Sequence, residues 1–268
     1  MNVLTRNNVK VSGQGNTPMI FAHGFGCDQN MWRFVAPEFE RDYRIVLFDH
    51  VGSGNSDLRA YDRNKYGTLE GYARDVLEIL GTLGMSKAVF VGHSVSATIG
   101  LLAAAMEPDR FERLVLVGPS PCYINDGDYI GGFGRGDIEG LLDALDSNFL
   151  GWSSQMAPVI MGNANRPELG AELTNSFCRT DPDIAAHFAR VTFLSDNRKD
   201  LERVKTPSLI LQCAQDVIAP EPVGRYLHAK LPQSELFLMK ATGHCPNLSA
   251  PEETVAAMKR YLGAAPIA

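Results

Sequence analysis

One serine in this chain stands where a strand, a sharp turn and a helix are expected to follow one another. Residues 91–96 read VGHSVS, and they come after an apolar run and before an alanine-rich helical pattern. A turn of this kind lifts a hydroxyl clear of its own backbone, and the N-terminus of the following helix directs N–H groups toward developing negative charge. We therefore predict that Ser94 is a nucleophile.

A second serine, Ser96, occupies a position at which the usual motif has glycine. That glycine allows the helix to pack closely on the strand, and a hydroxymethyl group is the smallest polar departure from it. Because the motif is short, an ordinary strand-to-helix turn remains the alternative at this point. The choice between the two depends on whether Ser94 has chemical partners elsewhere in the chain.

A serine hydroxyl needs a base to accept its proton, and histidine suits this role when a carboxylate fixes its tautomer. Asp216 comes two residues after the end of the strand-like run 209–214, and His244 lies in a loop after the last apolar run. The order serine, acid, histidine, each at a strand end, predicts a triad of Ser94, Asp216 and His244. Asp49 is the best rival acid, but it follows an earlier strand.

Acyl transfer also needs two N–H donors for the oxygen that becomes negatively charged. The first is expected to be the backbone N–H of Val95, the residue after the nucleophile. The second is expected from Phe25 in the run HGFG at 23–26, because the glycines on both sides let its backbone turn toward the site. The Phe25 ring would then form part of a pocket wall. A plain glycine turn is the competing interpretation.

Composition excludes several classes of protein. The 268 residues are 45% hydrophobic and 21% charged, which is ordinary for a globular enzyme. The net charge of -6 and the lack of a basic run argue against a nucleic-acid partner. No uninterrupted apolar run is long enough to span a membrane, and the first residues do not have the pattern of a signal peptide.

The cysteines favour a reducing compartment. The chain has 5 of them, without CxxC spacing and without metal-ligand spacing to the 6 histidines. An odd number fits free thiols better than a disulfide framework. We therefore expect a cytoplasmic protein that needs no metal and no other cofactor.

Six apolar runs predict strands that are covered on both faces, as in a parallel sheet. Helical patterns alternate with them, one over 69–80 with Thr68 as its N-cap and one from the serine turn to about Met106. This alternation predicts an α/β fold with a mostly parallel, doubly wound sheet. The predicted strands are Met19–Ala22, Ile45–Phe48, Ala88–Val91, Leu114–Val117, Leu209–Leu211 and Leu236–Met239.

The alternation of predicted strands and helices stops between about 121 and 197, where no strand is apparent. Four short helices are predicted there, at Ile138–Phe149, Gly151–Met161, Pro167–Phe177 and Asp181–Leu194. We interpret residues 121–197 as a helical lid over the carboxyl ends of the strands, and residues 1–120 and 198–268 as the core. A scaffold insertion that never touches a ligand is the alternative.

The apolar residues of this insertion predict an enclosed pocket for a small apolar ester, lactone or enol ether. Ser120 and Tyr123 are expected to supply polar contacts. The apolar lining is predicted to consist of Phe25, Phe133, Leu141, Leu145, Trp152, Met156, Val159, Phe177, Phe193 and Val217.

Several runs resemble the RsbQ-like group of α/β-hydrolases, which are bacterial stress-response proteins related to the plant karrikin and strigolactone receptors. The serine at 96 is part of that group's own pattern. The resemblance implies an α/β-hydrolase fold with a four-helix lid inserted between strands, and it supports the same triad and oxyanion donors. The runs are HGFG at 23–26, DHVGSGNS at 49–56, GHSVSA at 92–97, GPSPCY at 118–123 and GHCP at 243–246.

The resemblance also implies a biological role. It indicates a serine hydrolase of the carboxylic-ester type that acts in stress-response signalling, with a phosphatase carrying a sensory domain (RsbP-like) as its partner. The alternative within the same group is a ligand-responsive receptor in which hydrolysis is slow or incidental.

Overall fold

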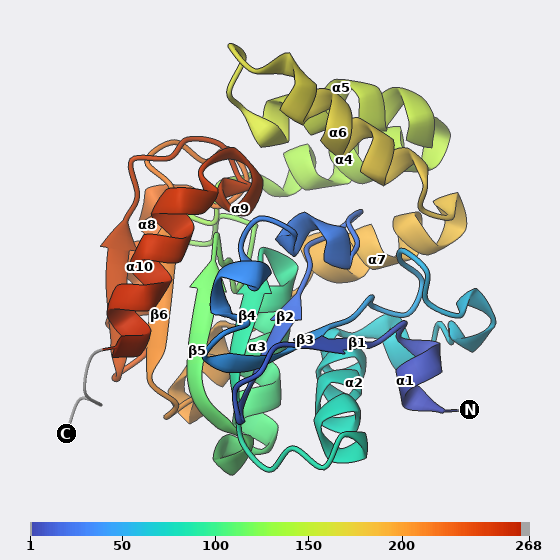
Figure 1. Cartoon of the computed structure of the whole chain (residues 1–268). Coiled ribbons are helices and arrows are strands. Elements are labelled where there is room, and N and C mark those ends of the chain that lie inside the picture. The colour runs from blue at the N-terminus through green and yellow to red at the C-terminus, as the bar shows by residue number, and fades with distance from the viewer. Residues whose placement is uncertain (1, 264–268) are drawn as a thin grey trace.

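The computed structural model describes residues 2–263; residue 1 and residues 264–268, which belong to the predicted core segments, lie outside the described part. Seven strands form one sheet in the order β1-β3-β2-β4-β5-β6-β7 (Figure 1). All neighbours pair in parallel except β1, which runs antiparallel to β3. The strands are β1 (Lys10–Ser12), β2 (Thr17–Ala22), β3 (Tyr43–Leu47), β4 (Ala88–His93), β5 (Phe111–Val117), β6 (Ser208–Gln212) and β7 (Ser234–Leu238).

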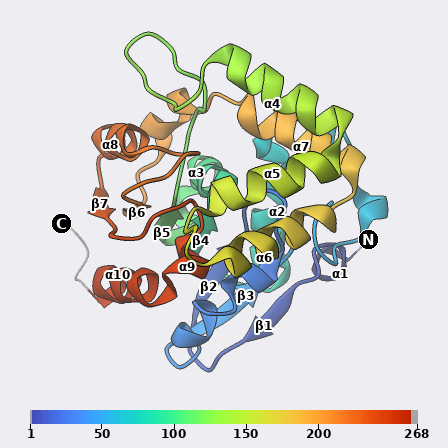
Figure 2. The same ribbon diagram turned by 90° about the horizontal axis from the view of Figure 1, so that it is seen from above.

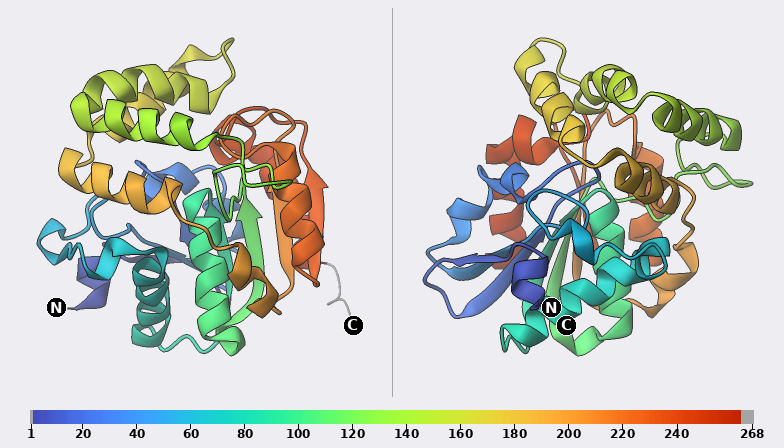
Figure 3. Two further views of the ribbon diagram at one scale, coloured as in Figure 1. Left: turned by 180° about the vertical axis from the view of Figure 1, so that it is seen from behind. Right: turned by 90° about the vertical axis from the view of Figure 1, so that its right-hand side faces the viewer.

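Helices cover both faces of this sheet, which confirms the predicted α/β class (Figures 2 and 3). On one face lie α2 (Leu69–Thr82), α3 (Val95–Met106) and α8 (Glu221–Lys230), and on the other lies α10 (Pro251–Gly263). Alternate residues of β2 enter the two cores, Phe21 on the α10 side and Ile20 on the α2 side. The two shortest helices are α1 (Val3–Arg6) and α9 (Pro246–Ser249).

The six predicted strands are all present, and one strand was missed. β1 has three residues, all exposed, so it carries no apolar run that the sequence pattern could reveal. β3 also ends at Leu47, one residue earlier than predicted. Hydrophobic patterning therefore identifies the strands that carry an apolar run, including the partly exposed edge strand β7, and misses the polar edge strand β1.

Four helices stand between β5 and β6 in the chain: α4 (Arg135–Ser147), α5 (Phe149–Met161), α6 (Pro167–Cys178) and α7 (Pro182–Phe193). Figure 1 shows them above the edge at which the parallel strands end. α4 begins earlier than predicted because the Asp137 carboxylate accepts a hydrogen bond from the Gly134 N–H at 2.9 Å and caps the first turn. Within residues 2–263, no helix has the length and apolar character needed to cross a bilayer.

Candidate active site

Ser94 forms a sharp turn between β4 and α3. Its backbone has φ 58° and ψ −125°, a conformation that residues with side chains rarely adopt. The Ser94 N–H donates to the Val117 carbonyl of β5 at 2.8 Å, which holds the strained turn at the end of the sheet. The side chain is thereby presented above the carboxyl ends of β4 and β5.

The structure brings together the three side chains that the sequence singles out. The Ser94 hydroxyl and His244 Nε2 are 2.7 Å apart, and His244 Nδ1 lies 2.7 Å from Asp216 Oδ2. Since the carboxylate accepts from Nδ1–H, Nε2 is the free base that accepts the serine proton. All three residues are buried, with at most 7% of their surface exposed.

Asp216 is held as an acceptor from several sides. Its Oδ1 accepts the N–H groups of Ile218 at 2.8 Å and Ala219 at 3.0 Å, which leaves Oδ2 for His244. Burial opposes ionisation, but the charge of His244 and these hydrogen bonds outweigh it, so the pKa of Asp216 lies below its usual value. The carboxylate is therefore charged at neutral pH and can stabilise a protonated imidazole.

The backbone of His244 is fixed by two neighbours. His93 Nε2 donates to the His244 carbonyl at 2.7 Å, and the His244 N–H donates to the carbonyl of Ile160 in α5 at 2.9 Å. Gly243, with φ 82°, makes this contact possible, because a Cβ there would lie 1.9 Å from the Met161 carbonyl oxygen. Burial and the charge of His244 lower the pKa of His93 to about 3, so it stays neutral.

The two expected oxyanion donors lie on either side of Ser94. Val95 is the first residue of α3, and the Phe25 loop packs against the serine turn so closely that a Cβ at Gly24 would lie 2.6 Å from His93 Nδ1. Among the bonds of the described chain, neither the Phe25 N–H nor the Val95 N–H donates to a protein acceptor. Both are thus available to a substrate oxygen.

Ser96 ties the Phe25 loop to α3. Its hydroxyl donates to the His23 carbonyl at 2.5 Å and accepts from His50 Nε2 at 2.7 Å. His23 in turn accepts the His50 N–H at 3.0 Å and donates to the Gly24 carbonyl at 2.8 Å. The serine that replaces the usual glycine therefore anchors the loop that carries one oxyanion donor.

A small cavity of about 30 Å³ lies over Ser94, with room for about two water molecules. Four predicted pocket residues line it, namely Phe25, Tyr123, Phe177 and Phe193. The remaining lining residues are Cys27, His93, Ser94, Ile160, Leu173, Thr192, Ile218, His244 and Cys245.

The other predicted pocket residues do not line this cavity. Val159 and Val217 are each 52% exposed, because α5 turns Ile160 rather than Val159 inward and the main chain carries Ile218 rather than Val217 toward the site. Trp152 lies behind Phe177, with ring centroids 5.7 Å apart. The other five pack in the core or bond locally: Ser120, which donates to the Cys122 carbonyl, and Phe133, Leu141, Leu145 and Met156. Met156 and Leu145 thus support the insertion instead of facing a ligand.

Two cysteines line the cavity but are not among the predicted pocket residues. Cys27 follows the Phe25 loop and Cys245 follows His244, so each is carried into the cavity by the neighbouring functional residue. Burial raises the pKa of Cys27 to about 12 and that of Cys245 well above its usual value. Both thiols stay protonated, which leaves Ser94 as the nucleophile of this cavity.

The rival acid Asp49 has a structural role. Its carboxylate accepts the N–H groups of Gln29 at 2.8 Å and Asn55 at 2.9 Å, and the Asn8 amide at 2.7 Å. These bonds tie together the loops that follow β2 and β3 and the turn after α1. Among residues 2–263, no cluster of three or more histidines, cysteines and carboxylates is arranged to hold a metal ion.

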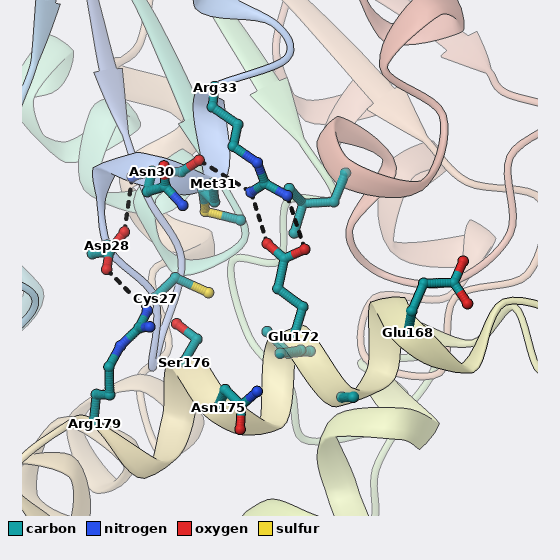
Figure 4. Close-up of a pocket in the computed structure, with 13 residues that line it drawn as sticks. Cys27, Asp28, Asn30, Met31, Arg33, Glu168, Glu172, Asn175, Ser176 and Arg179 are labelled. Atoms are coloured by element: carbon teal, nitrogen blue, oxygen red, sulfur yellow. Dashed lines mark hydrogen bonds and ion pairs between the residues drawn. The ribbon is translucent and has the colours of Figure 1, made fainter.

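A larger open groove of about 490 Å³ lies beside the cavity, between α6 and the loop after β2 (Figure 4). Ion pairs span it, with Arg33 2.7 Å from Glu172 and Arg179 3.3 Å from Asp28. Cys27 lines both the groove and the cavity. The groove lacks a nucleophile paired with a base, so the candidate active site is the smaller cavity.

Comparison with known proteins agrees with this geometry. Residues 19–257 match the alpha/beta hydrolase family. The chain is 38% identical to a karrikin insensitive 2 receptor from Petunia hybrida, over 96% of this chain and 95% of that one. It is also 38% identical to a strigolactone esterase from Arabidopsis thaliana, over 97% and 98% of the two chains. A solved hydrolase from Oleispira antarctica superposes with a TM-score of 0.96 at 43% identity, covering 98% of this chain and 97% of that chain. This chain is therefore an enzyme of the alpha/beta hydrolase family.

Proposed function

We propose that this protein is a serine hydrolase for small apolar esters or lactones. The observation that carries the proposal is the buried hydrogen-bonded series from Ser94 through His244 to Asp216 beneath a mostly apolar cavity. Ser94 Oγ attacks the substrate carbonyl carbon while His244 Nε2 takes its proton. The N–H groups of Phe25 and Val95 stabilise the oxyanion. The protonated His244 then gives its proton to the departing alcohol, and water releases the acyl group by the same route.

The lining of the cavity, rather than its volume of about 30 Å³, supports a small, mostly apolar substrate. Aromatic and aliphatic side chains surround Ser94, and the insertion contributes several of them, among them Ile160, Leu173 and Phe177. We therefore assign residues 121–197 the role of a lid. Burial raises the pKa of Tyr123, so its hydroxyl stays protonated. The nearby Ser94 hydroxyl opposes this rise in the pKa, but the two hydroxyls do not form a hydrogen bond of normal geometry. The Tyr123 hydroxyl is thus a candidate donor to the ligand.

Replacing Ser94 by alanine tests the mechanism. Turnover of p-nitrophenyl esters of increasing acyl length should disappear, with the circular dichroism and melting temperature unchanged within error. Ser154→Ala is the matched control, because that exposed hydroxyl only bonds the Leu150 carbonyl of its own helix at 2.9 Å. Ester turnover that survives in Ser94→Ala would overturn the mechanism.

A second candidate function is ligand-responsive signalling with slow hydrolysis. Two relatives at 38% identity favour it, since one is named as a receptor and the other as a strigolactone esterase. In this second proposal, which follows the resemblance of the RsbQ-like runs, the protein acts in a cytoplasmic stress response and its partner is a phosphatase that carries a sensory domain. Intact-protein mass spectrometry separates the candidates. A single burst that leaves a stable adduct on the wild type, but not on Ser94→Ala, supports signalling, whereas sustained turnover supports a hydrolase.

A further inference from the structure

One hydroxyl in the candidate cavity has no use in the proposed mechanism. Thr192, in the last turn of α7, is 1% exposed and lines the cavity together with Ser94. Its Oγ1 is buried and has no hydrogen-bond partner among the described residues. A buried hydroxyl without a partner is uncommon in proteins, because the lost hydration is not replaced.

Other helical hydroxyls of this protein solve the same problem locally. Ser153 donates to the Phe149 carbonyl at 2.7 Å, and Thr174 donates to the Gly170 carbonyl at 3.0 Å, each four residues back in its own helix. Thr254 does the same with Ala250, at 3.0 Å. This bond is a standard option for serine and threonine inside a helix. Thr192, which lines the cavity, does not form it, so its hydroxyl remains without a partner.

No acceptor among the described residues lies within hydrogen-bond distance of Thr192 Oγ1. Ile160, Leu173 and Ile218 are apolar, and the next residue, Phe193, packs its ring against Tyr123 at a centroid distance of 5.0 Å. Tyr123 carries the other unpartnered hydroxyl of the cavity. Ser94 already has His244 as its acceptor. A molecule bound in the cavity can therefore supply the acceptor that the Thr192 hydroxyl lacks.

We propose that Thr192 determines specificity by donating a hydrogen bond to a second acceptor oxygen of the substrate, separate from the carbonyl that Ser94 attacks. This inference rests on the proposed hydrolase function and narrows its substrate class. The substrate is a small apolar ester or lactone that carries a further ether or carbonyl oxygen. Such an oxygen is satisfied by one donated bond, whereas a hydroxyl on the ligand would bring a proton that needs its own acceptor in an apolar wall.

The test compares esters that differ only by an oxygen in place of a methylene group. The pairs are methyl pentanoate with methyl 3-methoxypropanoate, and methyl hexanoate with methyl 4-methoxybutanoate. Affinities are measured by NMR chemical-shift titration on Ser94→Ala, which removes the nucleophile and keeps the ligands intact. The same measurements are made after adding Thr192→Val, which is isosteric, or the control Thr174→Val, whose hydroxyl is bonded within α6.

For at least one pair, Thr192→Val should weaken the ether ester relative to its alkyl partner by about tenfold, the worth of one hydrogen bond. Thr174→Val should leave this ratio unchanged. An unchanged ratio in Thr192→Val, an equal fall in both variants, or binding of neither ester overturns the proposal. The hydrolase function is judged separately by Ser94-dependent turnover, so a failure of one conclusion is not mistaken for a failure of the other.

Discussion

Acid should destabilise this protein partly through His93, which is buried beside the candidate base. Burial and the nearby charge of His244 lower the pKa of His93 to about 3 in the folded state, against about 6.5 in an unfolded chain. Between these values the unfolded state binds a proton that the folded state does not. The free energy of unfolding is therefore unaffected by the titration of this histidine above pH ~6.5. As the pH falls below that value, the free energy of unfolding decreases by about 1.4 kcal/mol per pH unit. Integrated from pH 7 to pH 5, the loss is about 2 kcal/mol.

Urea unfolding at pH 7 and pH 5 measures this loss when wild type is compared with His93→Gln. Glutamine does not titrate, and its amide can still donate to the His244 carbonyl that His93 Nε2 contacts. The groups that face His93, namely His23, Asp216 and His244, are present in both proteins, so their effects on the free energy of unfolding largely cancel. The variant should lose about 2 kcal/mol less than wild type on acidification. Equal losses would refute the neutral buried histidine; His93→Asn provides a second non-titrating variant.

Two further predictions concern the groups around Ser94. Asp216→Asn should lower kcat by about 10⁴-fold, because the amide donates where the carboxylate accepts and so favours the wrong tautomer of His244. Stopped assays with a short-chain ester measure this, and a fall below tenfold would remove Asp216 from the mechanism. Ser96→Ala should lower the free energy of unfolding by about 2 kcal/mol or more, because the His23 carbonyl and His50 Nε2–H lose a buried partner. It should also reduce kcat more than it raises KM, because the Phe25 loop loses its anchor. Ser153→Ala is its buried control, and equal effects of the two substitutions on kcat would contradict a role for Ser96 in positioning that loop.

The sequence identifies the parts of the fold that repeat a strong physical pattern. The parallel strands carry apolar runs, even the partly exposed edge strand β7, so six of them can be predicted, and the residues at their ends can be aligned in space. Asp216 and His244 are found in this way. The exposed strand β1 has no such pattern.

The cavity lining is harder to predict, because it depends on the rotation of short helices. α5 is apolar on more than one side, so Val159 and Ile160 are equivalent in composition, and only packing decides that Ile160 faces inward. Thr192 was missed for a related reason. A threonine within a helical pattern ordinarily bonds its own backbone, and only the structure shows that this one does not.

The hydrogen bond from the His244 N–H to the Ile160 carbonyl links the candidate base to the outer surface of the molecule. α5 cannot move away from the core without withdrawing this acceptor, so the position of α5 and the alignment of His244 are thermodynamically coupled. Coupling of this kind is reciprocal: a ligand that aligns His244 stabilises the docked α5, and a contact that shifts α5 disturbs His244 by the same free energy. The outer face of α5 exposes 59% of Leu150 and 52% of Val159. The chemical state of a buried site is thereby expressed at the protein surface.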